Sequence, residues 1–220
     1  MEALWLTLQL ALFSTLILIV LATPLAWWLA HSQFKGKALV EALVALPLVL
    51  PPTVLGFYLL IVLGPDGPGG WLASFWGGNT LAFSFSGLLI GSVIYSLPFV
   101  VQPLQNGFVL IGKKPLEVAY TLKASFWDGF RSVILPLAKP AYISAATLGF
   151  AHTLGEFGVV LMIGGNIPGE TQVISIAIYE QVEAMEYAQA HGLSALLLFI
   201  SFTLLAIIYK ARKHQGGGLL

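Results

Sequence analysis

The sequence predicts an all-α integral membrane protein with about five transmembrane helices, a polar helical loop in the cytoplasm and a short amphipathic helix outside. Hydrophobic residues make up 58% of the chain and charged residues 9%, a composition typical of membrane proteins. The apolar residues gather in segments near the roughly 20 residues that a membrane-crossing helix needs. All ten Lys and Arg lie in the segments expected on one side. The absence of cysteine excludes disulfides, thiolate metal sites and cysteine nucleophiles.

Apolar segments are predicted to cross the membrane five times and to form a single domain over residues 1–220. They cover residues 4–30, 38–63, 87–111, 137–163 and 193–209. The first segment has Trp5 near one end and Trp27 near the other, as expected at membrane interfaces. It is not a signal peptide, because Lys35 and Lys37 follow it, whereas the positive charges of a signal peptide precede its apolar part.

The distribution of positive charge predicts the orientation of these segments. Every Lys and Arg lies within residues 35–37, 113–139 or 210–213, and none lies in 64–86 or 164–190. Cytoplasmic loops of membrane proteins carry an excess of Lys and Arg. We therefore predict that the N-terminus lies outside and the C-terminus in the cytoplasm.

The segments assigned to the outside are rich in turn residues and carboxylates. Residues 64–70 read as a loop, because Gly and Pro dominate them. Residues 172–187 have one apolar stripe and three glutamates elsewhere, and are too short and too acidic to cross the membrane. This pattern predicts an amphipathic helix at the outer surface, with Thr171 as its cap.

The second and third spans contain residues poorly suited to contact with lipid. Prolines within a helix free carbonyl groups, which lipid cannot satisfy but a neighbouring helix or an aqueous path can. A structural kink alone would explain the prolines equally well. The candidates for a translocation path in these two spans are Pro47, Pro51, Pro52, Gln102, Gln105 and Asn106.

The fourth span carries His152 and Glu156, which share a helix face if the helix is continuous. An ionisable residue within the membrane is costly and usually has a function. Counting ~1.5 Å per residue from Pro136 places Glu156 near the outer end. We expect it to belong to an outer gate, beside the path, with His152 as a potential partner. The alternative is a partly hydrated carboxylate that joins helices by hydrogen bonds.

No cofactor, metal site or catalytic site is predicted. His152 and Glu156 are too few ligands for a structural metal. Gly107, Gly112 and Lys113 have phosphate-loop spacing, but Lys114 replaces the expected Ser or Thr and the stretch ends a membrane helix. No nucleophile–base motif is present in the sequence. Nothing indicates nucleic-acid binding.

The polar segment 113–136 predicts two short helices between membrane spans. Pro115 suits the first turn of a helix. Ser125 and Asp128 have the spacing of a capping box, which would start a second helix, and Pro136 is expected to end it. The segment could serve as a docking element or be a solvated loop.

This segment resembles the EAA loop of ABC importer permeases, through Glu117-Val118-Ala119, Thr121-Leu122 and Ile134-Leu135-Pro136. The resemblance implies a type I ABC importer permease fold whose coupling helices contact a cytoplasmic ATPase. Lys123 stands where that family usually has Gly. We call residues 113–136 the coupling segment. The coupling residues that the resemblance implies are Glu117, Ala119, Thr121, Leu122, Ser125, Leu135 and Pro136.

Residues 34–60 and 153–179 are similar to molybdate-type permeases in particular. This resemblance implies a homodimer in a bacterial inner membrane, two cytoplasmic ATPase subunits and a periplasmic molybdate-binding protein, with molybdate and also tungstate as substrates. A homodimer also fits the small number of spans. Two alternatives stay open. The chain could be an ABC permease for another oxyanion such as tungstate, sulfate or phosphate, or a secondary transporter or channel without an ATPase.

Overall fold

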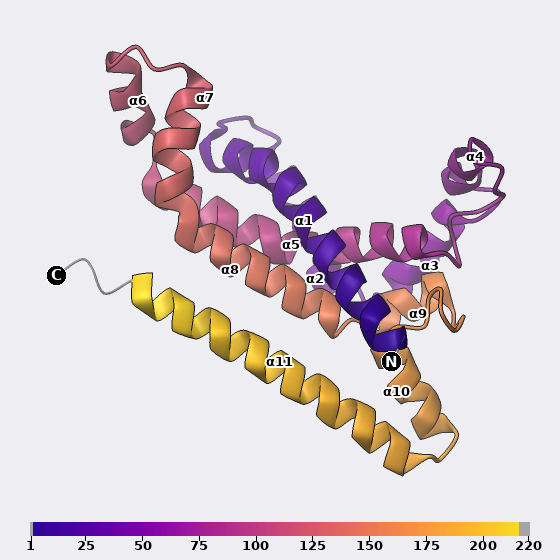
Figure 1. The fold of residues 1–220 in the computed structure, drawn as a ribbon. Helices are drawn as coiled ribbons and strands as arrows, with labels where there is room; N and C mark the ends of the chain where they lie inside the picture. Colours follow the sequence, from indigo (N-terminus) through magenta and orange to yellow (C-terminus); the bar gives the residue numbers. More distant parts are fainter. Residues whose placement is uncertain (1, 216–220) are drawn as a thin grey trace.

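Three long apolar helices pack together at the centre of the molecule (Figure 1). They are α1 (Glu2–His31), α5 (Phe85–Ile111) and α8 (Leu135–Leu154). The computed structural model describes residues 2–215, with the side chains of 208 and 211–215 excepted. Leu18, Val100, Leu104 and Phe108 are fully buried between these helices. Every regular element among the described residues is helical, which confirms the predicted fold class.

Four helical segments within residues 2–215 are long and apolar enough to cross a membrane, or five if one bent pair counts as a span. The bent pair is α2 (Lys37–Val49) and α3 (Pro52–Leu63), whose axes differ by 111°. The predicted segment 38–63 is therefore not one straight helix, and the kink that its prolines allow is a sharp bend between two helices. The physical reason is the Pro51-Pro52 pair, since residues before proline are restricted to extended conformations. Leu50 and Pro51 both have ψ of 135°.

The fourth span also differs from its predicted limits of 137–163. The helix α8 ends at Leu154, and a break over residues 155–157 separates it from α9 (Gly158–Gly164). At the other end, α7 (Phe126–Gly129) and the π-helical turn η1 (Phe130–Ile134) continue directly into α8. Pro136 therefore does not end the second short helix. The wider π turn, in which Leu135 N–H donates to Phe130 O, lets the chain pass a proline without ending the helix.

Short helices cover the two ends of the central bundle (Figure 1). The helix α6 (Lys114–Thr121) lies with α7 at one end, whereas α4 (Pro68–Ser74) and α10 (Ile174–Glu183) lie at the other. The predicted amphipathic helix is α10, but Thr171 does not cap it. Thr171 is fully buried, and its hydroxyl donates to Gly164 O at 2.7 Å.

The last helix, α11 (Tyr187–Gln215), is longer than the predicted span 193–209. It contacts α10 near its start and α8 along its side, and runs apart from the rest of the bundle (Figure 1). Leu198, Phe199 and Phe202 are among its exposed apolar side chains. These residues are available to lipid or to another protein chain.

Candidate translocation and coupling sites

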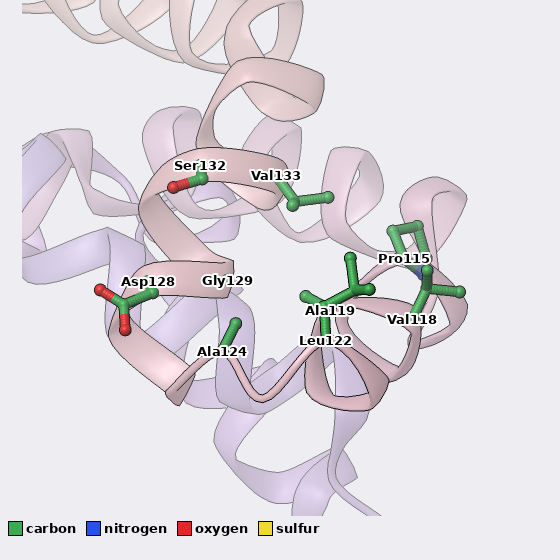
Figure 2. A pocket seen from close by; sticks show the side chains of 9 residues that line it. All are labelled: Pro115, Val118, Ala119, Leu122, Ala124, Asp128, Gly129, Ser132 and Val133. Atoms are coloured by element: carbon green, nitrogen blue, oxygen red, sulfur yellow. The ribbon is translucent and has the colours of Figure 1, made fainter.

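The helices α6 and α7 of the coupling segment lie at an angle to each other and are joined by a short turn (Figure 2). We call this pair of helices the fork. The predicted capping box is confirmed, because Ser125 and Asp128 exchange side-chain to backbone hydrogen bonds at the start of α7. The two helices approach closely where Gly129 faces Leu116, since an added Cβ at 129 would lie 2.6 Å from a Leu116 methyl carbon. The turn between them places Lys123 at φ +60°. A glycine is therefore not needed for the bend, although glycine adopts this conformation most easily.

An apolar cavity of about 430 Å³ lies inside this fork (Figure 2). Val118 and Leu122 line this cavity, and their side chains are 60% and 79% exposed. The coupling segment therefore has an apolar surface that is open to contact with another protein. Exposed apolar side chains of this kind mark interaction surfaces. The side chains that line the cavity are Pro115, Val118, Ala119, Leu122, Ala124, Asp128, Gly129, Ser132 and Val133.

The predicted coupling residues occupy different places. Glu117, Thr121 and Ser125 are exposed on the outside of the fork. Ala119 is buried and Leu122 is exposed, and both line its cavity. Leu135 and Pro136 are the first two residues of α8 and do not end a short helix. Leu135 faces a second groove, formed with α1, and Pro136 is exposed.

Aromatic side chains connect the fork to the membrane helices. The centre of the Trp27 ring on α1 lies 5.2 Å from the centre of the Phe108 ring on α5 and 5.4 Å from that of the Phe130 ring on η1. It also contacts Phe126 on α7 at 6.3 Å. The sequence indicates Trp27 only as an interfacial residue and does not indicate this role. These edge-on ring contacts pack the fork against α1 and α5.

A polar cluster lies near the other end of α5. The Ser92 hydroxyl donates to Oε2 of Glu156 at 2.8 Å, and Ser96 Oγ lies 2.9 Å from Nδ1 of His152. Glu156 and His152 therefore bond to α5 and not to each other. Their predicted pairing fails because α8 ends at Leu154, so that Glu156 no longer continues the helical face of His152.

The breaks in α2–α3 and α8–α9 meet at a cavity of about 500 Å³. Of the predicted path residues, Pro52, His152 and Glu156 line it, and Pro47 and Pro51 do not. Pro47 is buried within α2, which continues through it. The complete lining is Pro52, Thr53, Tyr95, His152, Gly155, Glu156, Phe157 and Gly158.

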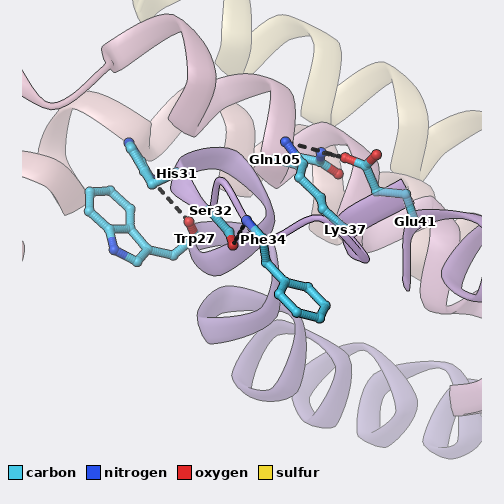
Figure 3. Close-up of polar contacts among 7 residues, drawn as sticks. All are labelled: Trp27, His31, Ser32, Phe34, Lys37, Glu41 and Gln105. Carbon is cyan, nitrogen blue, oxygen red and sulfur yellow. Dashed lines mark hydrogen bonds and ion pairs between the residues drawn. The ribbon is translucent and has the colours of Figure 1, made fainter. Parts of the chain in front are cut away.

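Polar residues continue from this cavity along α5 toward the coupling segment. Gln102 and Asn106 are exposed, and Gln105 donates to Oε1 of Glu41 on α2 at 2.7 Å (Figure 3). Lys37 lies 3.6 Å from the same carboxylate oxygen. The sequence interpretation overlooked Glu41. Its spacing of four residues from Lys37 was a usable indication of an ion pair.

The described residues contain no group of three or more His, Asp or Glu side chains that could hold a metal ion. Hydrogen bonds and one ion pair connect the polar side chains along this face.

Comparison with known proteins identifies the family. The family described as "Binding-protein-dependent transport system inner membrane component" matches residues 22–214. The chain belongs to this family. This permease is 57% identical over 217 residues to the molybdenum transport system permease protein ModB of Azotobacter vinelandii, covering 99% of the chain and 96% of the relative. It is 36% identical over 182 residues to ModB of Escherichia coli, covering 83% and 80%.

Other relatives and solved structures extend the comparison. The permease is 34% identical over 193 residues to the sulfate transport system permease protein CysT of Escherichia coli, covering 87% of the chain and 69% of the relative. A bacterial ABC transporter involved in import of the polysaccharide alginate has a TM-score of 0.77 at 18% identity, covering 97% of this chain and 78% of that one. This likeness confirms the fold of an ABC transporter permease.

Proposed function

We propose that this permease is the transmembrane subunit of an ATP-driven importer for molybdate, and also for tungstate. The observation that carries the proposal is the 57% identity to a molybdenum transport permease over nearly the whole chain. The relatives named for sulfate transport are less similar, at 37% identity or below. Another oxyanion such as sulfate is the second candidate, because those relatives also match most of the chain.

The permease works as a homodimer with two cytoplasmic ATPase subunits and a periplasmic binding protein. Neither a nucleotide-binding motif nor a catalytic motif occurs in the sequence, so ATP hydrolysis belongs to the partner. The ATPase contacts the fork of the coupling segment, whose exposed Val118 and Leu122 offer an apolar docking surface. The N-terminus is periplasmic and the C-terminus cytoplasmic, as the Lys and Arg distribution favours.

The path runs between the two subunits along the polar face of α5. Exposed amide side chains on a membrane helix favour a wet surface over lipid, and Gln102 and Asn106 are such residues. Glu156 and His152 belong to the outer gate, and the contacts of Gln105 with Glu41 lie nearer the cytoplasmic end.

Uptake by reconstituted vesicles tests this function. The permease–ATPase complex is placed in vesicles loaded with ATP, and molybdate is supplied outside with its binding protein. We expect accumulation that needs hydrolysable ATP and is reduced by tungstate but not by sulfate. If the complex accumulates sulfate in preference to molybdate, the proposed substrate is wrong but the proposed role as an ATP-driven importer stands. Accumulation without ATP or an ATPase would favour a channel or secondary transporter.

A further inference from the structure

The cavity beside Glu156 contains a buried carboxyl oxygen without a partner. Glu156 is only 4% exposed, and its Oε2 accepts the hydrogen bond from Ser92. Its other oxygen, Oε1, is buried and has no hydrogen-bond partner among the described residues. Buried polar atoms rarely lack a partner. Glu156 also lines the cavity, so a small displacement of its side chain would bring Oε1 to an occupant.

Three other side chains bring unused polar groups to this cavity. Thr53 and Tyr95 each contribute a hydroxyl group. His152 uses Nδ1 for its contact with Ser96, which leaves Nε2 free. When Ser96 donates to Nδ1, the ring proton lies on Nε2, and His152 becomes a donor. An anionic occupant would select this tautomer.

Two of the carbonyl groups at the α8–α9 break already accept hydrogen bonds within the chain. The Ala151 carbonyl accepts from Gly155 N–H at 3.3 Å, and the Glu156 carbonyl accepts from the Ser175 hydroxyl at 2.6 Å. The helix α3 begins at Pro52 on the cavity wall with no side-chain cap. The positive end of its dipole therefore adjoins the cavity. This helix end suits an anion better than a cation.

The charge state of Glu156 follows from its surroundings. No Lys or Arg lines the cavity, and the ion pair found among the described residues is the one between Lys37 and Glu41. An isolated buried carboxylate is costly without a paired charge. The neutral acid is therefore the favoured form, with Oε2 accepting from Ser92 and Oε1 carrying the proton.

We propose that this cavity is a transient binding site for a tetrahedral oxyanion during transport, formed by neutral hydrogen-bond donors. The donors are the hydroxyls of Thr53 and Tyr95, Nε2–H of His152 and the protonated carboxyl of Glu156. The inference rests on the proposed function and assigns Glu156 a contact with substrate, which the gate role did not include. A volume of about 500 Å³ leaves room for a partly hydrated anion. Binding without a cationic side chain is weak, which allows release toward the cytoplasm.

Cysteine protection tests the site without transport. The chain has no cysteine, and an added Cβ at Gly155 would meet no atom closer than 3.8 Å. In the permease–ATPase complex without binding protein or ATP, tungstate should slow labelling of Gly155→Cys by a small thiol reagent. The control is Gly192→Cys on α11, where nothing lies within 4 Å of the added atom and labelling should not change.

Removal of one donor gives a matched pair of variants. Tyr95→Phe in the Gly155→Cys background should weaken tungstate protection by up to about tenfold, the equivalent of one lost hydrogen bond. Tyr58→Phe changes an exposed tyrosine of α3 outside the cavity and should leave protection unaltered. Equal labelling with and without tungstate overturns the proposal. The proposal is also overturned if sodium chloride alone slows the labelling as much as tungstate does. It is equally overturned if the thiol at position 155 does not react with the reagent under any condition.

Uptake by two variants of Glu156 supplies a second readout. Glu156→Gln keeps a neutral donor, whereas Glu156→Met has a similar size and none. We expect the Gln variant to transport molybdate within about threefold of the original protein, and the Met variant to be slower by up to about tenfold. Equal rates for both variants overturn the role of Glu156. If the original complex moves no molybdate but tungstate still protects residue 155, the proposed function fails while the site stands.

Discussion

Lys123 holds the turn between α6 and α7 in a conformation that glycine adopts most easily. Its φ is +60°, which costs an L-residue roughly 1–2 kcal/mol. Importer permeases, which this segment resembles, usually have a glycine at this position. The bend is present in the structure, and the unfavourable backbone conformation falls on Lys123, which is exposed.

We therefore expect Lys123→Gly to stabilise the permease slightly, by up to about 1 kcal/mol, because relief of strain exceeds the added flexibility of the unfolded chain. Thermal unfolding in detergent measures the change. Lys123→Ala is the control, since it removes the charge but keeps Cβ. Equal stabilisation by Gly and Ala would mean that the side chain and not the backbone conformation limits stability.

Glu117 is exposed on α6, and its side chain makes no hydrogen bond or ion pair within the described residues. Glu117→Lys should leave folding intact while weakening association with the ATPase, because it reverses a charge on the proposed docking surface. Co-purification of the ATPase measures this effect. Asp66→Lys reverses an exposed charge in the α3–α4 loop and should leave ATPase binding unchanged. Full association of the Glu117→Lys variant would remove this residue from the contact.

At the level of elements, the approach of α5 and α8 depends on small residues. A Cβ added at Gly107 would clash with Cβ of Ala141. Membrane helices pack closely where small residues meet. Tyr142 next to this contact also reaches α1, through a 3.0 Å contact between its hydroxyl and Thr23 Oγ1.

Gly107→Ala should therefore destabilise the permease by about 1–3 kcal/mol, the usual cost of overpacking. The reciprocal double variant, Gly107→Ala with Ala141→Gly, moves the methyl group from one helix to the other and should recover most of the loss. Thermal unfolding of the single and double variants gives the comparison. Failure of the second change to compensate would show that the helices are separated by another contact.

The helices that the sequence predicts best are those whose apolar run is uninterrupted. The helix α5 covers the predicted span 87–111 to within two residues at its start. The breaks were less predictable, because hydropathy reports which residues avoid water and not where the backbone turns. Pro47 and the Pro51-Pro52 pair look alike in composition, yet only the pair breaks the helix. The extended residue required before each of two successive prolines explains the difference.

The candidate site was predictable in its residue types but not in its partners. Glu156 stands out as an ionisable residue in an apolar run. Its bond to Ser92, however, depends on the break after Leu154, which lets the chain turn toward α5. Trp27 and Glu41 were missed because each has an ordinary local explanation, as an interfacial ring and as a residue flanking a loop. Contacts between segments far apart in the chain gave them their roles.

At the scale of the whole molecule, the described positive charges gather at the end that carries the coupling segment. The loop 32–36 and α6 lie at that end, whereas α4 and α10 lie at the opposite end (Figure 1). The segments between α3 and α5 and between α9 and α11 contain no Lys or Arg. A bilayer placed between the two ends would have its cytoplasmic side at α6.

Single cysteines introduced into the cysteine-free chain test this orientation. Ser74, Asn166 and Ser125 are all exposed, and the first two lie in segments without positive charge. An impermeant thiol reagent added to intact cells should label cysteines at 74 and 166 but not at 125. After permeabilisation, position 125 should label as well, which shows that its thiol is reactive. Thr171 is unsuitable because it is fully buried. Labelling of position 125 from outside would invert the permease and move the proposed ATPase contact to the wrong side of the membrane.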